Sequence, residues 1–131
     1  MNETVPTFFA VAIGGALGAM LRFRFRFLTQ KLKYSASSFV PNIIASFLLG
    51  FVTALFADAF FAVQSWQAWF YPFLAIGVAG SLSTFSALAL EMNENTKKLG
   101  WQKSIGYVVI VLLSGLTALF LGLYLGTSVP T

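Results

Sequence analysis

The 131-residue sequence has no cysteine, no histidine and only four acidic residues. The missing cysteines exclude disulfides and thiol chemistry, and the missing histidines remove the commonest metal ligand. With so few carboxylates there is almost no material for carboxylate-pair catalysis, and we do not expect an enzyme. Charged residues make up only 9% of the chain, whereas ordinary soluble domains contain roughly 25%. Hydrophobic residues are abundant instead, at 58%, which indicates a protein that lies in lipid.

Four long apolar runs divide the chain. Each is near the ~20 residues that a helix needs to cross a ~30 Å hydrocarbon core. We therefore predict an all-α integral membrane protein in which residues 1–131 form a single domain of four transmembrane helices. The predicted helices span about 5–21, 39–57, 67–90 and 104–126.

The basic residues fall in only two places, directly after the first run and between the third and fourth runs. Both places lie on the same side of the membrane, and the opposite side carries Glu3 and Asp58 but no Lys or Arg. Because short loops rich in Lys and Arg stay cytoplasmic, both termini are predicted to face outward from the cell's inner (plasma) membrane. The basic residues are Arg22, Arg24, Arg26, Lys31, Lys33, Lys97, Lys98 and Lys103.

Small residues recur along three of the predicted helices and indicate close helix packing. Such faces let helix backbones approach each other in lipid, either within one subunit or between subunits. A four-helix chain is too thin to enclose a pore by itself, so we expect an oligomer. The small residues are Gly14, Gly15 and Gly18 in the first helix, Ala45, Ser46 and Gly50 in the second, and Ser114, Gly115, Ala118 and Gly122 in the fourth.

The stretch from Gly77 to Glu91 lies in the third run, yet it is rich in glycine and hydroxyl residues. Gly77 and Gly80 should loosen a helix, and the hydroxyls of Ser81, Ser83, Thr84 and Ser86 follow them. Irregular backbone survives at membrane depth only where it is buried in protein or lines a water-filled path. We therefore predict that the third helix is broken near its middle. A break frees carbonyl groups for a cation and N–H groups for an anion.

The polar groups expected at membrane depth are neutral. Asn42, early in the second helix, brings two amide donors and one acceptor, although taken alone it suits an interhelical hydrogen bond equally well. No Lys or Arg lies in the centre of a predicted span to hold a large anion, and no carboxylate lies there to serve a cationic or proton-coupled cargo. Neutral donors and the positive edges of aromatic rings suit a small hard anion. Phe85, beside the hydroxyl residues, is placed to present such an edge.

The segment Gly80-Ser-Leu-Ser-Thr-Phe-Ser86, followed by Glu91, resembles the Gly-Gly-Leu-(Ser/Thr)-Thr-Phe-Ser-Thr-Phe-Ser-x-Glu signature of the small fluoride channels, the Fluc or CrcB family. The glycine-rich segment ending in Leu-Arg22 is similar to the family's first helix, and Asn42 and Thr117-Ala-Leu119 match motifs of its second and fourth helices. The resemblance covers nearly the whole chain. It implies a passive channel that exports fluoride from the cytoplasm down its gradient. It further implies two antiparallel subunits, two pores along their interface, and a sodium ion at the paired helix-three breaks.

The same resemblance implies roles for single positions. The backbone carbonyls of Gly80 and Ser83 would be this subunit's ligands to sodium. Asn42 would be a pore hydrogen-bond donor, and Phe85 the first of two phenylalanines whose edges face fluoride. The other matched residues are Ser38, Thr84 and Ser86 as hydroxyl contacts, Ser114 one position away from the family's pore serine, and the charged residues Arg22 and Glu91.

Two features depart from the family pattern. The second pore phenylalanine falls at position 88, where this chain has Leu88. Leu88 is one turn from Phe85 and is expected to face the same way, but its methyl groups lack a polarised edge. The one-sided basic residues predict a single orientation, whereas an antiparallel homodimer needs a chain that inserts both ways. We therefore predict a heterodimer with a homologous four-helix subunit of opposite orientation, in which the pore built on Phe85 and Leu88 is weak or silent.

Two other functions compete with this interpretation. A non-conducting subunit that only supports the assembly of a fluoride channel subunit would tolerate Leu88. A small multidrug transporter has a similar length and also forms antiparallel dimers, but it needs a glutamate embedded in its first helix. The only candidate, Glu3, precedes the first run. The expected partners are fluoride, the lipid bilayer and the second subunit, and no nucleic acid.

Overall fold

The computed structural model describes residues 4–31, 36–57 and 66–130, and within these ranges the chain is all helical with no strand, as predicted. Three segments are long and apolar enough to cross a membrane: Thr4–Thr29, Gln67–Leu99 and Trp101–Thr127. A fourth apolar helix, Phe39–Leu55, is shorter at 17 residues. In chain order the helices are α1 (Thr4–Thr29), α2 (Phe39–Leu55), α3 (Gln67–Pro72), the π-helix η2 (Phe73–Ala79), α4 (Gly80–Leu82), α5 (Phe85–Leu99) and α6 (Trp101–Thr127).

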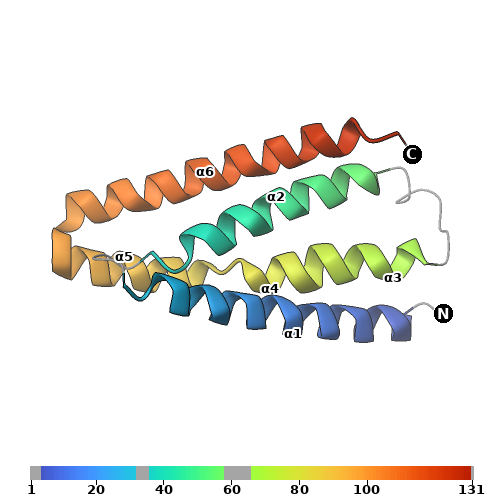
Figure 1. Ribbon diagram of the computed structural model, residues 1–131, viewed down its shortest axis with the longest axis horizontal. Coiled ribbons are helices and arrows are strands. Elements are labelled where there is room, and N and C mark those ends of the chain that lie inside the picture. The colour runs from blue at the N-terminus through green and yellow to red at the C-terminus, as the bar shows by residue number, and fades with distance from the viewer. Residues whose placement is uncertain (1–3, 32–35, 58–65, 131) are drawn as a thin grey trace.

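The helices form an up-and-down bundle in which α3, η2, α4 and α5 follow one another as one interrupted rod (Figure 1). α1 packs along α3, η2 and α4, whereas α2 packs along α6 over most of its length. α5 packs against the first part of α6. The first turn of α1 and the last turn of α6 lie at one end of the bundle, and the connection between α5 and α6 lies at the other (Figure 1).

The last turns of α1 and the α5–α6 connection lie toward the same end of the bundle (Figure 1), and the described basic residues belong to these two segments. One group belongs to the last turns of α1 and the residues after it, and the other flanks the α5–α6 connection. Both groups therefore sit at the same end, which the predicted orientation requires. Lys33 and the acidic Glu3 and Asp58 lie outside the described residues. The described basic residues are Arg22, Arg24, Arg26, Lys31, Lys97, Lys98 and Lys103.

Two helices continue beyond the limits of the apolar runs. α1 ends at Thr29, past the expected limit at Leu21, and α5 ends at Leu99, past the expected limit at Leu90. Arg, Lys and Glu are good helix formers, and neither extension contains Gly or Pro, so the helix continues where the apolar run stops. Gly100 then ends α5 with φ 93° and ψ 159°, a backbone conformation open essentially to glycine alone.

Several of the glycines bring helices of the same subunit into backbone contact. A Cβ on Gly14 would overlap the carbonyl oxygen of Phe73 in η2, and a Cβ on Gly77 would lie 2.9 Å from the Cα of Gly14. α2 and α6 meet in the same way, because a Cβ on Gly50 or Gly122 would overlap a backbone carbonyl of the facing helix. Gly14, Gly50, Gly77 and Gly122 therefore serve packing within the subunit, whereas Gly15 has open space around it.

Replacing Gly14 by valine is expected to separate α1 from η2, because the new side chain overlaps the backbone of Phe73. Overpacking of this kind lowers the free energy of unfolding by about 1–3 kcal/mol. Gly15→Val is the matched control: it carries the same cost in helix propensity, but a Cβ on Gly15 meets nothing within 4 Å. Thermal unfolding in detergent measures both variants. Equal midpoints for the two would contradict the predicted contact.

The rod formed by α3, η2, α4 and α5 is interrupted at Ser83 and Thr84, which confirms the break that was predicted in the third helix. Both residues are extended, with φ −82° and ψ 140° at Ser83 and φ −153° and ψ 128° at Thr84. Of the two glycines that were expected to loosen the helix, Gly77 lies within the π-helix η2, which is wound more loosely than an α-helix, whereas Gly80 has ordinary helical backbone (φ −64°, ψ −34°). Gly77 also packs on Gly14. The interruption falls within the hydroxyl residues instead.

Candidate functional site

A hollow opens beside the break. Its volume is about 290 Å³, and α2, α5 and α6 line it together with the extended Ser83 and Thr84. Most of its surface is apolar, and none of its lining residues is charged. It therefore offers neutral polar groups in an apolar setting. We call it the break hollow, and its lining residues are Asn42, Ser46, Leu49, Ser83, Thr84, Phe85, Leu88, Val111, Leu112, Gly115, Leu116 and Leu119.

The side chain of Asn42 is hydrogen-bonded to the backbone at the break. The backbone N–H of Thr84 donates to Oδ1 of Asn42 at 3.2 Å. Because a backbone N–H needs an acceptor, this bond identifies which end of the amide carries the oxygen. The two N–H donors of Asn42 are then directed elsewhere, and the residue lines the break hollow. The oxygen of Asn42 thus accepts a hydrogen bond from the break, and its amide N–H groups remain for another partner.

Phe85 and Leu88 both line the break hollow, but they are exposed to very different extents. Phe85 is 78% exposed, whereas Leu88 is 4% exposed. The two side chains therefore border the same hollow, as expected. Only Phe85 is accessible from outside the subunit. Phe85 stands at the open side of the subunit, and Leu88 belongs to its packed interior.

The break changes the hydrogen bonding of the carbonyls at Gly80 and Ser83. In an unbroken helix the N–H of Thr84 would donate to the carbonyl of Gly80, but here it donates to Asn42. Ser83 is itself extended, so its carbonyl lies outside the helical pattern. No cluster of acidic side chains able to hold a metal occurs in the described part of the chain. A cation at the break would therefore rely on backbone oxygens, which are suitable ligands for a hard ion.

The predicted hydroxyl contacts divide into two sets. Thr84 and Ser86 hydrogen-bond each other at 2.9 Å beside the break, and Ser38 is buried at the start of α2. Ser114 bonds back to the carbonyl of Ile110 in its own helix and does not line the break hollow. Such back-bonding is common for serine in transmembrane helices. The structure therefore brings Thr84 and Ser86 to the break and leaves Ser114 apart from it.

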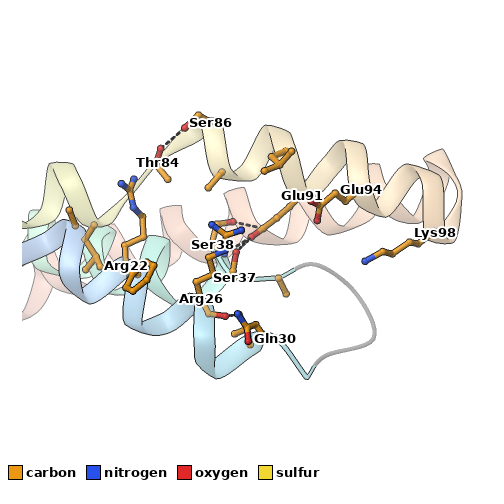
Figure 2. Close-up of a pocket in the computed structure, with 17 residues that line it drawn as sticks. Arg22, Arg26, Gln30, Ser37, Ser38, Thr84, Ser86, Glu91, Glu94 and Lys98 are labelled. Carbon is orange, nitrogen blue, oxygen red and sulfur yellow. Dashed lines mark hydrogen bonds between the residues drawn. The ribbon is translucent and has the colours of Figure 1, made fainter.

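A second, larger cavity adjoins the break on the side of α1. Its volume is about 650 Å³, and it carries three basic side chains, Arg22, Arg26 and Lys98, and two acidic ones, Glu91 and Glu94. Figure 2 shows Arg22 and Arg26 entering from α1 and Lys98 from α5. We call it the basic cavity. Thr84 lines both it and the break hollow, so the two spaces meet at the break.

Glu91 is buried in the wall of the basic cavity, at 3% exposure, and accepts hydrogen bonds from four donors. The hydroxyl of Ser37 and the backbone N–H of Ser38 donate to Oε1 at 2.6 and 2.7 Å. The hydroxyls of Ser38 and Tyr107 donate to Oε2 at 2.6 and 2.8 Å. Figure 2 shows the bonds from the two serines. Four donors stabilise a negative charge that would otherwise be costly to bury.

Two members of this cluster, Ser37 and Tyr107, were not predicted as site residues. Ser37 had a signal in the sequence, since it forms a hydroxyl pair with Ser38 directly before α2. Tyr107 had none, because its distance of 16 residues from Glu91 is bridged only by the turn between α5 and α6. Arg22 and Glu91, which the sequence placed on separate helices, line the same cavity.

Comparison with known proteins gives a consistent picture. Residues 9–123 match the protein family described as "CrcB-like protein, Camphor Resistance (CrcB)". A protein of Ruegeria pomeroyi named "Fluoride-specific ion channel FluC" is 32% identical over 130 residues, which cover 96% of this chain and 94% of the relative. "Fluoride-specific ion channel FluC 1" of Listeria innocua is 34% identical, covering 91% and 96%. "Fluoride-specific ion channel FluC 2" of Halalkalibacterium halodurans is 31% identical, covering 100% and 93%.

Proposed function

Since this chain belongs to the CrcB family, we propose that it is a subunit of a passive fluoride channel that exports F⁻ from the cytoplasm down its gradient. The channel would lie in the plasma membrane. Its two basic clusters would face the cytoplasm and its termini the outside, following the preference of Lys and Arg for the cytoplasmic side. It would catalyse no chemical reaction.

The observation that carries this proposal is the chemistry of the break hollow. It combines the amide donors of Asn42, the hydroxyl of Thr84 and the exposed ring of Phe85, and its lining has no charge of either sign. A small anion that sheds its water needs donors in return. A fixed cation at the same depth would bind the ion too tightly for it to leave, whereas neutral donors and ring edges permit both entry and exit.

The basic cavity would deliver fluoride to the break hollow. Arg22, Arg26 and Lys98 attract anions and raise their local concentration. Glu91 and Glu94 line the same cavity, so its basic side chains outnumber its acidic ones by three to two. The four donors to Glu91 partly offset the negative charge of that residue. In the proposed route fluoride crosses from this cavity, past Thr84 and Ser86, to Asn42, where a second subunit would supply the ring edges.

A second subunit is needed to close the pore, because Phe85 is 78% exposed on the open side of the break hollow. We propose that this subunit is homologous and antiparallel, so that the two breaks meet at the centre of the dimer. The carbonyls of Gly80 and Ser83 from both subunits would hold a structural sodium ion there. The position of these carbonyls at the break supports this proposal, because the N–H of Thr84 donates to Asn42 and not to the carbonyl of Gly80.

We further propose that the dimer is a heterodimer. The described basic residues all lie toward one end of the bundle, which favours a single orientation for this chain. Leu88 occupies the interior beside Phe85 and offers no ring edge. One pore would combine this chain's Asn42 with the partner's phenylalanines and conduct. The other, built on Phe85 and Leu88, would be weak or silent.

Fluoride efflux from liposomes, measured with a fluoride electrode, tests these proposals. The chain reconstituted alone should give little efflux, whereas co-expression with a homologous subunit of opposite charge bias should give fast fluoride efflux and no chloride efflux. Reporter fusions on the chain alone should show one orientation. Fast fluoride efflux from the chain alone, or mixed orientation, would refute the heterodimer. Absence of fluoride efflux from the co-expressed pair would refute the channel itself.

One observation favours a second candidate function, a non-conducting subunit that supports the assembly of an active one. Position 88 is a leucine, so this chain does not provide the second ring of its own pore. A multidrug transporter is not supported, since α1 carries no acidic residue over Thr4–Thr29 and Glu91 is already engaged by four donors. Substitution of Asn42 separates the first two functions.

A further inference from the structure

A third recess lies beside the basic cavity near the basic end of the bundle, and Thr29 and Ala36 line both spaces. Its other described lining residues come from α2, α5 and α6: Phe39, Val40, Asn95, Leu99, Lys103, Gly106, Tyr107 and Ile110. Its volume is about 500 Å³, and its surface is mostly apolar. Phe39, Val40 and Ile110 supply apolar side chains, and Lys103 is the only charged residue among the described residues of its lining. Val40 and Ile110 are 38% and 58% exposed, so the recess is open to the surroundings of the bundle. We call it the α2–α6 groove.

The α2–α6 groove and the break hollow lie on different faces of α6. Lys103, Gly106, Tyr107 and Ile110 line the groove at the three- and four-residue spacing of one helical face. The hollow uses another set on the same helix, Val111, Leu112, Gly115, Leu116 and Leu119. A second subunit that covers the break hollow therefore leaves the groove facing lipid.

The groove runs from the membrane boundary into the hydrocarbon core. Lys103 is in the first turn of α6, among the basic residues that mark the proposed cytoplasmic interface. Ile110 lies two turns deeper, about 10 Å along the helix axis. Gly106 lies between them, and a Cβ placed there would meet nothing within 4 Å, so the groove has room over this turn.

We propose that the α2–α6 groove binds an anionic phospholipid of the cytoplasmic leaflet. The headgroup phosphate pairs with Lys103, and one acyl chain lies over Gly106 against Phe39, Val40 and Ile110. The charge fits this occupant, since the described lining residues offer one cation and no carboxylate at the interface, followed by an apolar channel. Basic residues close to the membrane surface each strengthen the binding of anionic lipid about fivefold.

Lipid in the groove would also touch the ion route. Tyr107 lines the groove, and its hydroxyl donates to Oε2 of Glu91 at 2.8 Å. An acyl chain beside the Tyr107 ring therefore restricts the residue that holds Glu91. This consequence for flux rests on the proposed function, whereas lipid binding does not.

Native mass spectrometry of the chain purified in detergent tests lipid binding without measuring fluoride. Phosphatidylglycerol and phosphatidylcholine with the same acyl chains are titrated separately. Phosphatidylglycerol should bind about fivefold more tightly, and Lys103→Gln should remove that preference. Gly106→Leu should fill the groove and weaken the binding of both lipids at least tenfold. Millimolar inorganic phosphate should not displace the lipid, since it has no chain to occupy the groove.

Two matched controls share the chemistry of these variants but lie outside the groove. Lys97→Gln removes a basic residue of the same cluster, and Gly15→Leu adds the same side chain to a glycine that also has open space around it. Both should bind lipid like the parent chain. Equal affinity for the two lipids, equal effects of Lys103→Gln and Lys97→Gln, or unchanged binding by Gly106→Leu would each overturn the proposal. Because fluoride is not measured, such a failure is distinct from a failure of the channel function.

Discussion

Replacing Asn42 by leucine is expected to lower the fluoride flux of the co-expressed pair by about 10- to 100-fold. Leucine has a similar volume but neither donor nor acceptor, and hydrogen bonds to an ion are worth about 1.5–3 kcal/mol each. The variant also leaves the N–H of Thr84 without the oxygen that it now meets at 3.2 Å. The variant should therefore lose both the hydrogen bond that Thr84 makes to Asn42 and the amide donors that would bind fluoride. Liposome efflux with a fluoride electrode gives the flux.

Two further variants separate these effects. Asn42→Asp keeps an oxygen for Thr84 but removes both donors and adds a negative charge, so flux should fall at least as far while the thermal midpoint stays close to that of the parent. Asn93→Leu is the control for asparagine loss, since Asn93 is exposed on α5 and lines neither cavity of the route. Unchanged flux from a folded Asn42→Leu pair would show that this chain lines no conducting route, which is the assembly-subunit alternative.

Replacing Glu91 by alanine is expected to destabilise the subunit more than any other single change at the basic cavity. The substitution removes the acceptor from two serine hydroxyls, one backbone N–H and the Tyr107 hydroxyl at once. Each buried donor left unsatisfied costs about 1–3 kcal/mol, so the total loss should reach about 3 kcal/mol even after some hydroxyls rotate. Glu91→Gln should fall between the parent and Glu91→Ala, because its amide keeps one acceptor oxygen. Thermal unfolding in detergent ranks the three.

The neighbouring Glu94 provides the control, because it lines the same cavity but is only half-buried. Glu94→Ala should cost less than Glu91→Ala. A double-mutant cycle between Glu91→Ala and Tyr107→Phe should show strong non-additivity, since the two residues are bonded directly. If Glu91→Ala unfolds at the temperature of the parent chain, the four hydrogen bonds do not hold this end of the bundle together.

The break between α4 and α5 was predicted from glycines and hydroxyl residues, and that reason is only partly right. The sequence places four hydroxyl residues and two glycines in an apolar run, which is enough to predict an interruption. It does not show that Gly77 is needed for contact with Gly14, or that Gly80 remains helical. At the break, Asn42 reaches from α2 and accepts the N–H of Thr84. That contact joins residues far apart in sequence, and no local pattern contains it.

The cluster around Glu91 shows a second kind of limit. By the apolar run alone Glu91 falls just past a helix end, where a carboxylate would meet water. The helix continues to Leu99 instead, and the start of α2 and the side of α6 fold over the carboxylate. Its burial depends on three segments meeting, so the sequence could name Glu91 but not its surroundings.

The sequence by itself determined the properties that follow from composition and spacing. Long apolar runs require helices in lipid, because backbone groups there must bond within their own segment, and one-sided basic residues favour one orientation. The signature from Gly80 to Glu91 determined the family, and the change at Leu88 is visible in the chain alone. Tertiary structure decided what those residues meet: Asn42 turns its oxygen to the break, Phe85 stays exposed while Leu88 is buried, and Glu91 collects four donors. The physical reason is that burial and hydrogen bonding between helices depend on distances in space, which the order of residues along the chain does not contain.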